Sequence, residues 1–465
     1  MLERWFPDRA DSAARLWITS AVVWIVIALS LGFLMATQFM FPDITKGVSW
    51  LTLSRIRPVH VNGAALGWLS MVMVGLIFYF APRLLKTRLW SERLGNVSGW
   101  LWNVNLATGL AFVLAGHQEG REWAELIAPF DWGVLIGLAL VAINVFLTIA
   151  NRRERPLYVS IWYFAGSLVW IAIVWIIGNR TFVPLDGLND AIAQWFYAHN
   201  VLGLWITTVI VGVSYYLLPR LTGNVLYSHL LSMVGFWTIA MFYPGVGVHH
   251  ILQTPVPEWL KTFAIVSSVL LFIPVAAVLI NFFMTMAGKW GAWSHNLPLR
   301  FLIVGNLLYL LTAMQGSFQA IRSVNWYLHF TQWVVAHAHL ALLGFASFIA
   351  WAGVYYVLPR LLGVEFYSKR LANYHFWLSL IGFAIFFSSL TVAGLIQSVG
   401  WSMGATVQSL VPFLMPYLAV RWVGAAMMIT GQYIFAYNVY RTIQAARAAQ
   451  AARAPAGASP APAGD

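Results

Sequence analysis

Long runs of apolar residues, separated by short segments rich in charged residues, proline or glycine, cover nearly the whole chain. Each run is close to the roughly 20 residues that an α-helix needs to cross the hydrocarbon core of a bilayer. The pattern therefore predicts an all-α integral membrane protein, a bundle of about 12 transmembrane helices. The predicted spans lie near residues 15–40, 58–82, 97–116, 131–150, 157–178, 190–218, 226–248, 259–287, 299–318, 327–358, 371–398 and 414–440.

Basic residues gather in the segments that follow every second predicted span. These segments are 83–93, 152–155, Arg220, 289–300, 360–370 and 441–453. Because loops rich in Lys and Arg stay on the cytoplasmic side of a membrane, this side is predicted to be the cytoplasm. An even number of spans then places both termini in the cytoplasm.

The composition supports this interpretation and limits the partners. The chain is 60% apolar and 9% charged, whereas a soluble protein of this length carries about a quarter charged residues. The net charge of +12 comes mostly from loop residues that report topology, so we expect a lipid bilayer and no nucleic acid as a partner. The absence of cysteine excludes disulfides, thiolate metal sites and a covalently attached c-type haem in this chain.

The last 21 residues differ in composition from the rest. Residues 445–465 are rich in Ala, Pro and Gly and lack apolar bulk, which is typical of disorder in water. We therefore predict one domain, residues 1–444, followed by a disordered cytoplasmic tail, residues 445–465.

Six of the 11 histidines lie inside or at the ends of predicted spans. An ionisable ring at membrane depth needs a hydrogen-bond partner or a metal, and one such histidine alone is usually a packing residue. Several histidines close together favour metal binding instead. The six are His60, His199, His249, His250, His337 and His339.

The segment Ala336-His337-Ala338-His339 carries two histidines on one helix. Residues two apart on an α-helix are separated by roughly 200° around its axis, so the two rings point to opposite sides. Such a helix can hold two planar haems, one on each flank. His60 is then available as the second axial ligand opposite His339 in a six-coordinate low-spin haem, and His337 leaves its haem one open position.

His199 and the adjacent pair His249 and His250 form the third group. Three neutral imidazoles without a thiolate or carboxylate suit copper or zinc, and copper is the redox-active choice. Tyr243 precedes His250 by seven residues, about two helical turns, which places its phenol on nearly the same face. The alternative is that Tyr243 is an ordinary interfacial aromatic.

Several segments that together span the chain resemble the haem-copper oxygen and nitric oxide reductases, and specifically the catalytic subunit of cbb3-type cytochrome c oxidases. This resemblance implies the fold, a location in the bacterial cytoplasmic membrane, and proton-consuming electron transport. The segments, together with the HH pair at 249–250, are RIRPVHVNG, YAHNVLGLW, YYLLPRLTGNVLYSHLLSMVGFW, IRSVNWYLHFTQWVVAHAHLALLGF and PYLAVRWVGAAMMITGQYIFAYNVY.

The resemblance also implies a role for each candidate residue. His60 and His339 would bind the low-spin haem b, His337 the high-spin haem b, and the three remaining histidines the copper, or a non-haem iron in the nitric oxide reductases. Tyr243 stands where the oxidases have a tyrosine linked to the copper-ligand histidine of the sixth span, and such a phenol can supply an electron and a proton to O2. Arg57 would pair with haem propionates, and Glu122 and Glu125 resemble an acidic loop that helps to bind calcium.

Four positions differ from one or both of the two related groups of enzymes. Gln315 replaces a glutamate near the high-spin haem, and a neutral amide cannot carry protons as a carboxylate does. Thr331 and Gln332 resemble the nitric oxide reductases, since the oxidases usually have an aspartate there. Gly203 stands where cytochrome c-dependent nitric oxide reductases place a glutamate that binds non-haem iron.

Two enzymatic functions follow. One is a terminal oxidase that reduces O2 to water with electrons from a separate c-type cytochrome or cupredoxin subunit. The other is a nitric oxide reductase that joins two NO molecules into N2O. Because a carboxylate suits iron and three imidazoles suit copper, Gly203 and Tyr243 favour the oxidase.

A twelve-span transporter is disfavoured, because no repeat between the two halves is found and the histidine pattern has no use in transport.

Proton delivery is the last expectation. Tyr227 and Ser232 precede Tyr243 on the cytoplasmic half of the seventh span and could begin a hydrogen-bonded path; an interfacial aromatic and a helix-packing serine are the alternative.

Overall fold

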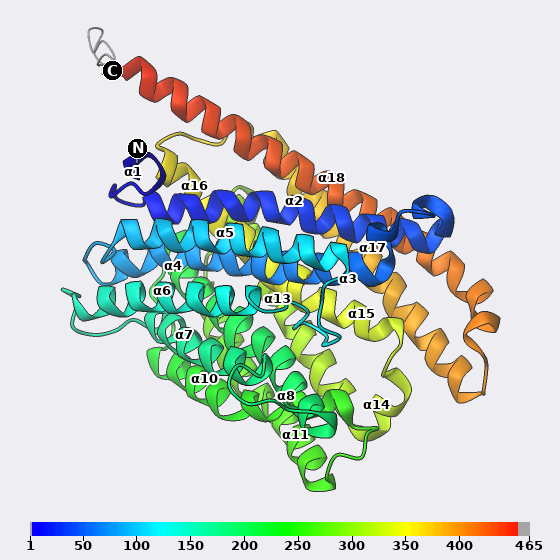
Figure 1. The fold of residues 1–465 in the computed structure, drawn as a ribbon. Coiled ribbons are helices and arrows are strands. Elements are labelled where there is room, and N and C mark those ends of the chain that lie inside the picture. Colours follow the sequence, from blue (N-terminus) through cyan, green and yellow to red (C-terminus); the bar gives the residue numbers. More distant parts are fainter. Residues whose placement is uncertain (1, 454–465) are drawn as a thin grey trace.

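The computed structural model describes residues 2–453, and this part of the chain holds twelve helical segments long and apolar enough to cross a membrane. Their long axes run in nearly the same direction, and α1 and the end of α18 lie at the same end of the bundle (Figure 1). No strand occurs in residues 2–453. The predicted fold class is confirmed.

Eight of the spans consist of one helix or of two consecutive helices. They are α2 (Ser12–Met40), α5 (Glu92–Ala115), α6 (Phe130–Ala150), α7 (Val159–Gly178), α11 with α12 (Glu258–Leu270 and Phe272–Thr285), α13 (Leu297–Gln319), α17 (Lys369–Ser402) and α18 (Val407–Arg453). A ninth is α10 (His229–Phe242), which continues into short 3₁₀ turns at Tyr243–Gly245 and Gly247–Ile251. Short helices lie outside the spans: α1 (Leu2–Trp5), α14 (Arg322–Leu328) and 3₁₀ turns at Pro42–Thr45, Ser49–Leu51 and Trp290–Ser294.

Three spans contain a π-helical segment between two α-helices. In each span this segment begins no more than three residues after one of the predicted histidine ligands. A π-helix widens the turn and is common at functional sites. The three spans are α3 (Leu53–Asn62), Gly63–Leu69 and α4 (Ser70–Leu84); α8 (Gly187–Asn200), Val201–Thr207 and α9 (Thr208–Thr222); and α15 (Gln332–His339), Leu340–Ser347 and α16 (Phe348–Leu362).

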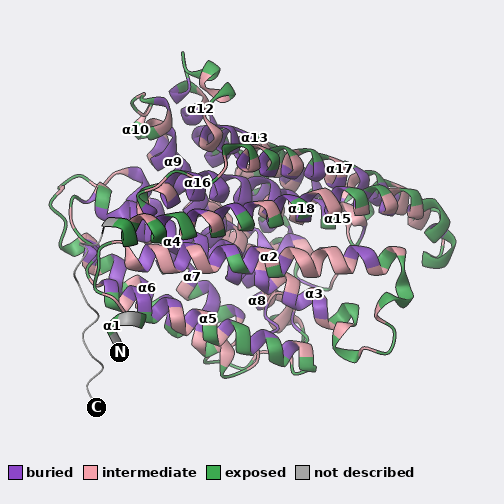
Figure 2. Ribbon diagram, turned by 90° about the horizontal axis from the view of Figure 1, so that it is seen from above, coloured by how far each residue is buried: buried purple, intermediate pink, exposed green. Residues whose placement is uncertain are grey.

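These three interrupted spans form the centre of the bundle. Their apolar windows are 94%, 89% and 89% buried, whereas the windows of the other nine spans are 33–50% buried. In Figure 2 the buried residues accordingly concentrate on the inner helices, and the exposed ones lie toward the rim. The outer faces of the nine peripheral spans remain free to contact lipid.

The bundle is built from three repeats of four spans each. In each repeat the central span packs against the first, as α4 does on α2, α9 on α7 and α16 on α13, and the last two spans pair, as α5 does with α6, α10 with α12 and α17 with α18. Each central span ends in Pro-Arg-Leu, at residues 82–84, 219–221 and 359–361. A search for a repeat between the two halves misses this order, because three copies do not coincide with halves.

In each repeat the same set of hydrogen bonds joins the start of the third span to the last span. An N-cap serine accepts a hydrogen bond from the backbone N–H three residues later, and its own peptide groups bond an asparagine side chain on the last span. The asparagine accepts from the serine N–H at 3.0 Å and donates to its carbonyl oxygen at 2.7–2.9 Å. The pairs are Ser91 with Asn144, Ser228 with Asn281, and Ser368 with Asn438.

The C-terminal boundary needs a correction. We predicted a disordered tail from residue 445, but α18 continues as a helix to Arg453. The segment AARAAQAAR is rich in alanine, the residue with the highest helix propensity, and it extends a helix that is already nucleated. Residues 454–465 of the predicted tail lie outside the described part of the chain.

Candidate metal centre

One cavity of about 460 Å³ lies inside the bundle, and all six predicted histidines line it. The remaining lining is mostly apolar and comes from all three repeats. A cavity of this size, largely apolar with a few convergent polar groups, has the character of a cofactor or ligand site. The structure thus brings together the side chains that the sequence singled out.

His60 on α3 and His339 at the end of α15 face each other across this cavity. Their ring centroids are 6.2 Å apart and the ring planes differ by 22°. Each Nδ1 bonds a backbone carbonyl oxygen, that of Ala28 at 2.7 Å and that of Val335 at 2.8 Å, so each Nε2 is left for the cavity. Two imidazole nitrogens about 2.0–2.1 Å from one metal place their centroids roughly 6 Å apart. The pair therefore fits two axial ligands of one haem iron.

His337 lies two residues earlier on α15 and lines the same cavity. Its Nδ1 bonds the side-chain oxygen of Gln315 on α13 at 3.0 Å. Because a neutral amide oxygen accepts this bond, His337 Nδ1 carries the proton and Nε2 is the free nitrogen. Gln315, the departure from the family pattern, thus orients a predicted haem ligand.

His199, His249 and His250 form the one group of three potential metal-ligand side chains found in residues 2–453, and their ligand atoms all lie within 4.8 Å of one another. His249 Nδ1 bonds the hydroxyl of Ser268 at 2.7 Å. His199 Nδ1 is buried and has no hydrogen-bond partner in the described chain. His250 stacks on Trp195 with 4.1 Å between centroids. Three imidazoles and no carboxylate are a donor set that fits copper.

The phenol of Tyr243 lies beside this cluster, with 5.3 Å between its ring centroid and that of His199. It starts the 3₁₀ turn that follows α10, and a second 3₁₀ turn then places His249 and His250 beside His199. The Tyr243 ring also packs against Gly203, four residues after His199 on the same span, where an added Cβ would overlap the ring carbons. The glycine is therefore required by the position of the tyrosine.

Glu122, in the acidic loop between α5 and α6, lines the cavity. It forms an ion pair at 2.9 Å with Arg57 on α3, which also lines the cavity. Glu125 is buried, and its carboxylate accepts a hydrogen bond from Asn62 at 2.9 Å. Burial raises the pKa of the Glu125 carboxyl above its usual value. Its second oxygen, Oε1, has no partner within residues 2–453, so one buried acceptor in this loop is left for a ligand.

Sequence reasoning missed three residues of the site. Ser268 holds His249, Thr207 lines the cavity beside Tyr243, and Arg421 is a buried cation on α18 that lines the same cavity. Arg421 lies in the RWVG segment that carried the resemblance, so that motif was the available signal. Ser268 and Thr207 belong to no motif.

Tyr227 and Ser232 do not reach the centre. The Tyr227 side chain is 55% exposed, and the Ser232 hydroxyl donates to the backbone oxygen of His229 in its own helix at 2.6 Å. Phe236 and Ile239 occupy the same face of α10 between Ser232 and Tyr243. Apolar side chains therefore lie between the Ser232 hydroxyl and Tyr243 along this face of α10.

Thr331 and Gln332, which resemble the nitric oxide reductases in sequence, have a structural role. It is the N-cap of α15, and its hydroxyl accepts a hydrogen bond from the backbone N–H of Trp333 at 3.3 Å. The backbone N–H of Gln332 donates to the side-chain oxygen of Gln397 at 2.7 Å. Both residues fix the start of the helix that carries His337 and His339.

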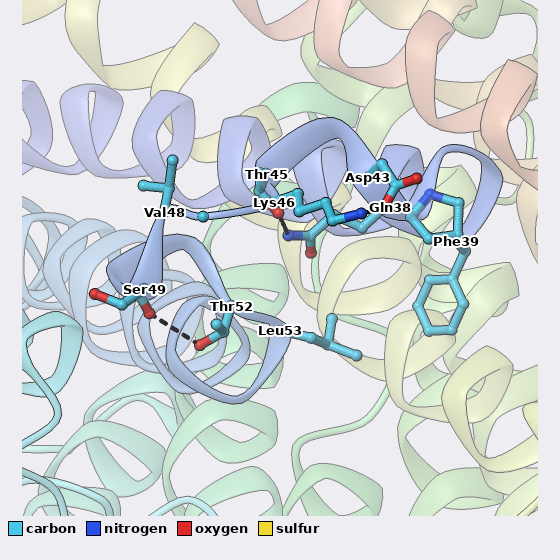
Figure 3. Close-up of a pocket in the computed structure, with 11 residues that line it drawn as sticks. Gln38, Phe39, Asp43, Thr45, Lys46, Val48, Ser49, Thr52 and Leu53 are labelled. Carbon is cyan, nitrogen blue, oxygen red and sulfur yellow. Dashed lines mark hydrogen bonds and ion pairs between the residues drawn. The ribbon is translucent and has the colours of Figure 1, made fainter.

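A second pocket, of about 600 Å³, lies between the end of α2 and the start of α3 (Figure 3). Gln38 donates to Thr45 and to the backbone oxygen of Leu51, both at 2.7 Å, and these bonds hold the loop in place. Lys46 and Asp43 form an exposed ion pair. The lining has no histidine and no buried charge, so we do not place the reaction there.

Comparison with known proteins decides the family. A family profile described as "Cytochrome C and Quinol oxidase polypeptide I" matches residues 12–427. The chain belongs to this family. It is 30% identical to the Cbb3-type cytochrome c oxidase subunit CcoN1 of Stutzerimonas stutzeri, over 92% of this chain and 94% of that protein. It is also 30% identical to the cytochrome c oxidase subunit 1 of Rhodobacter capsulatus, over 93% of this chain and 85% of that protein.

The fold of this oxidase family member agrees with a solved structure. The cryo-EM structure of a heme-copper terminal oxidase dimer superimposes with a TM-score of 0.77 over 93% of this chain and 84% of that one, at 15% identity. At that identity the match concerns the fold alone. Membership of the family brings haem and copper as cofactors, and the twelve spans make the chain a multi-pass protein of the bacterial cytoplasmic membrane.

Proposed function

We propose that this chain is the catalytic subunit of a terminal respiratory oxidase that reduces O2 to water, with electrons from a separate c-type cytochrome or cupredoxin subunit. Relatives at 30% identity over more than nine-tenths of the chain carry the names of cytochrome c oxidase subunits, which supports this activity. The chain has no cysteine to attach a c-type haem, which supports a separate subunit for electron delivery.

The proposed ligand roles follow from the rings around the cavity. His60 and His339 would hold a low-spin haem, supported by the 6.2 Å between their centroids. His337 would hold the high-spin haem, supported by its free Nε2. The resemblance to cbb3-type oxidases supports haem b at both positions. His199, His249 and His250 would hold copper, supported by their mutual distances within 4.8 Å.

The observation that favours O2 over NO is the contact between Tyr243 and Gly203. A glutamate at position 203, the added ligand of the cytochrome c-dependent nitric oxide reductases, would need the space that the Tyr243 ring fills. The three imidazoles would therefore bind the metal without a carboxylate, and the Tyr243 phenol would lie beside them. Nitric oxide reduction remains the second candidate, supported only by the neutral Gln315 and by Thr331 and Gln332.

When bound, the haems and copper supply the electrons and the metal centre at which O2 is reduced. The chain's own residues would position the metal ligands and deliver a proton to the reacting oxygen. Tyr243 would hold a proton at its phenol oxygen beside the copper ligands and release it to the reacting oxygen, and the resemblance implies a covalent link between its ring and His199. The hydrogen bonds that His337 donates to Gln315 and that His249 donates to Ser268 fix the tautomers and orientations of these rings.

Two further roles concern the rim of the cavity. Arg57 would exchange part of its pairing with Glu122 for a haem propionate, since a guanidinium matches a carboxylate in a low-dielectric site. A calcium ion bound by Glu122 and Glu125 is a further proposal, supported by the free, buried Oε1 of Glu125.

Metal analysis combined with turnover tests the proposal. Two irons and one copper per purified chain, with rapid O2 consumption that Tyr243→Phe abolishes, are the expected results. Three irons without copper, and N2O as the product from NO, would assign the chain to the nitric oxide reductases. Calcium retained after chelation in the wild type but lost in Glu125→Gln would support the calcium site, and no calcium in either would exclude it.

A further inference from the structure

The C-terminal end of α13 contacts the supports of two different predicted metal sites. Gln315 accepts a hydrogen bond from Nδ1 of His337 at 3.0 Å, and this contact stays within the third repeat. Ser317 donates its hydroxyl to the backbone oxygen of Ser268 at 2.7 Å, and Ser268 lies on α11 in the second repeat. Residues two apart on an α-helix point to nearly opposite sides. The end of α13 therefore lies between the helix that carries His337 and the helix that supports the proposed copper ligands.

The hydrogen bond of Ser317 crosses between helices. A serine inside a transmembrane helix commonly donates to a carbonyl oxygen of its own preceding turn, as Ser398 does at 2.9 Å. Ser317 is buried and bonds another helix instead, at the residue whose hydroxyl accepts from Nδ1 of His249 at 2.7 Å. Only Ser268 therefore separates α13 from a proposed copper ligand.

Asn325 makes a second link to the copper ligands. It is a buried residue of α14, which follows α13. Its side-chain N–H groups donate to the backbone oxygen of Gln319, the last residue of α13, at 3.1 Å and to that of His249 at 3.4 Å. Its side-chain oxygen accepts from Gln253 at 2.6 Å. The Asn325 side chain thus joins the end of α13 to residues 247–253, which we call the histidine turn.

Two glycines keep the backbone close on either side of this link. A Cβ added at Gly247 in the histidine turn would overlap the backbone oxygen of Trp195 on α8, so the turn cannot move toward that helix. A Cβ added at Gly316 would lie 3.2 Å from Cε1 of His337, so α13 lies directly against the ring of this predicted haem ligand. The histidine turn is therefore held between α8 on one side and α13 with α14 on the other.

We propose that Ser317 and Asn325 are positioning residues that fix the distance from the proposed copper ligands to His337, and thereby the distance between the copper and the high-spin haem. Ser317 acts through Ser268, and Asn325 acts through the backbone of the histidine turn. A displacement of about 1 Å at a reacting centre can cost roughly 10²-fold in rate, so this support matters for chemistry that needs two metals at once. The role rests on the proposed function, because it concerns a centre that holds both metals.

EPR spectra of the oxidised, purified holoenzyme test this role. Two paramagnetic ions that lie close together couple magnetically, and the separate signals of high-spin ferric haem and of Cu²⁺ are then lost. Asn325→Asp keeps the size of the side chain and an acceptor oxygen, but it has no N–H to donate to the two carbonyl oxygens. The double variant Asn325→Asp with Ser317→Ala is expected to show at least about fivefold stronger haem and copper signals than the wild type, at equal metal content.

Asn306→Asp is the matched control. Asn306 is a buried asparagine of α13 whose side-chain N–H bonds only the Leu302 oxygen of its own helix, at 2.8 Å. This variant should keep the wild-type EPR spectrum even if it unfolds at a lower temperature, so general destabilisation does not imitate the expected result. Full metal content with a wild-type EPR spectrum in the double variant would overturn the proposal.

A single variant decides the matter if Asn325→Asp loses its copper. Ser317→Ala leaves every hydrogen bond of the ligand rings in place, and the same two signals are expected to rise in it. Unchanged spectra at full copper content would overturn the proposal. Three irons and no copper per chain, with a haem signal that still rises in the double variant, would contradict the proposed function and not the positioning role.

Discussion

The ring of Tyr243 lies against the α-carbon of Gly203, so closely that a Cβ at position 203 would overlap its carbon atoms. One residue sits on the span that provides His199, and the other on the span that provides His249 and His250. The glycine therefore sets the distance between the two spans that carry the proposed copper ligands. A side chain at 203 would push the tyrosine and its span away from the cluster.

Gly203→Ala is therefore expected to lower copper content and O2 turnover by at least about tenfold while both haems remain bound. The steric reason is overlap with the Tyr243 ring. Metal analysis and optical spectra of the purified protein check it. Gly120→Ala is the matched control, because nothing lies within 4 Å of a Cβ there. Full copper occupancy in Gly203→Ala would contradict the assigned packing.

Removing His339 should cost one of the two haems. His339→Ala leaves His60 without its partner at 6.2 Å, so the low-spin absorption band is expected to disappear and the haem content to fall from two to one per chain. His375→Ala removes another buried histidine outside the cavity. It should keep both haems but unfold at a lower temperature, because about 1–3 kcal/mol is lost when the groups bonded to His375 are left unpaired.

Changing the acceptor at Gln315 should alter the bond between His337 and its iron. In Gln315→Glu a carboxylate would accept the hydrogen bond now made at 3.0 Å, which makes the imidazole a stronger donor to the metal. The iron–histidine stretching frequency in resonance Raman spectra is expected to rise, and to fall below the wild-type value in Gln315→Leu. Gln319→Glu, one turn away and bonded to Trp333, should leave it unchanged.

Ser268 should contribute to copper affinity although it does not bind the metal. Its hydroxyl holds Nδ1 of His249 at 2.7 Å, and loss of such an outer contact typically weakens metal binding about 10–100-fold. Ser268→Ala is expected to lose copper to a chelator faster than the wild type. Ser398→Ala is a buried control that bonds only its own helix. Identical copper loss in all three proteins would show that His249 needs no support.

The sequence predicts the parts of this structure that depend on composition and periodicity. The twelve spans follow from the length of the apolar runs. The six histidines stand out because polar residues are rare within those runs. The divergence of His337 and His339 was predictable because residues two apart on a helix point to different sides. The choice of His60 as the residue opposite His339 came from its place in another span and from the resemblance, not from the geometry of one helix.

Other features depend on contacts between distant segments. Ser268 and Thr207 matter through their position opposite a histidine and a tyrosine, and a single serine or threonine in an apolar run gives no signal of this. The path along α10 stays a prediction, and the apolar residues Phe236 and Ile239 lie between Ser232 and Tyr243 on the same face of that helix. The alanine-rich start of the tail was misjudged because low apolar content was taken for disorder, although alanine favours helix. The Pro-Arg-Leu repeats were visible, but their meaning depends on a threefold arrangement.

That arrangement has a consequence for biogenesis. His60 belongs to the first repeat and His339 to the third, whereas the proposed copper ligands all belong to the second. With the proposed ligands, the copper site would be complete as soon as the middle third of the chain has been inserted into the membrane. The proposed low-spin haem site would form only when the last third has been made and the first and last repeats have met. Binding of that haem would then join the first repeat to the third.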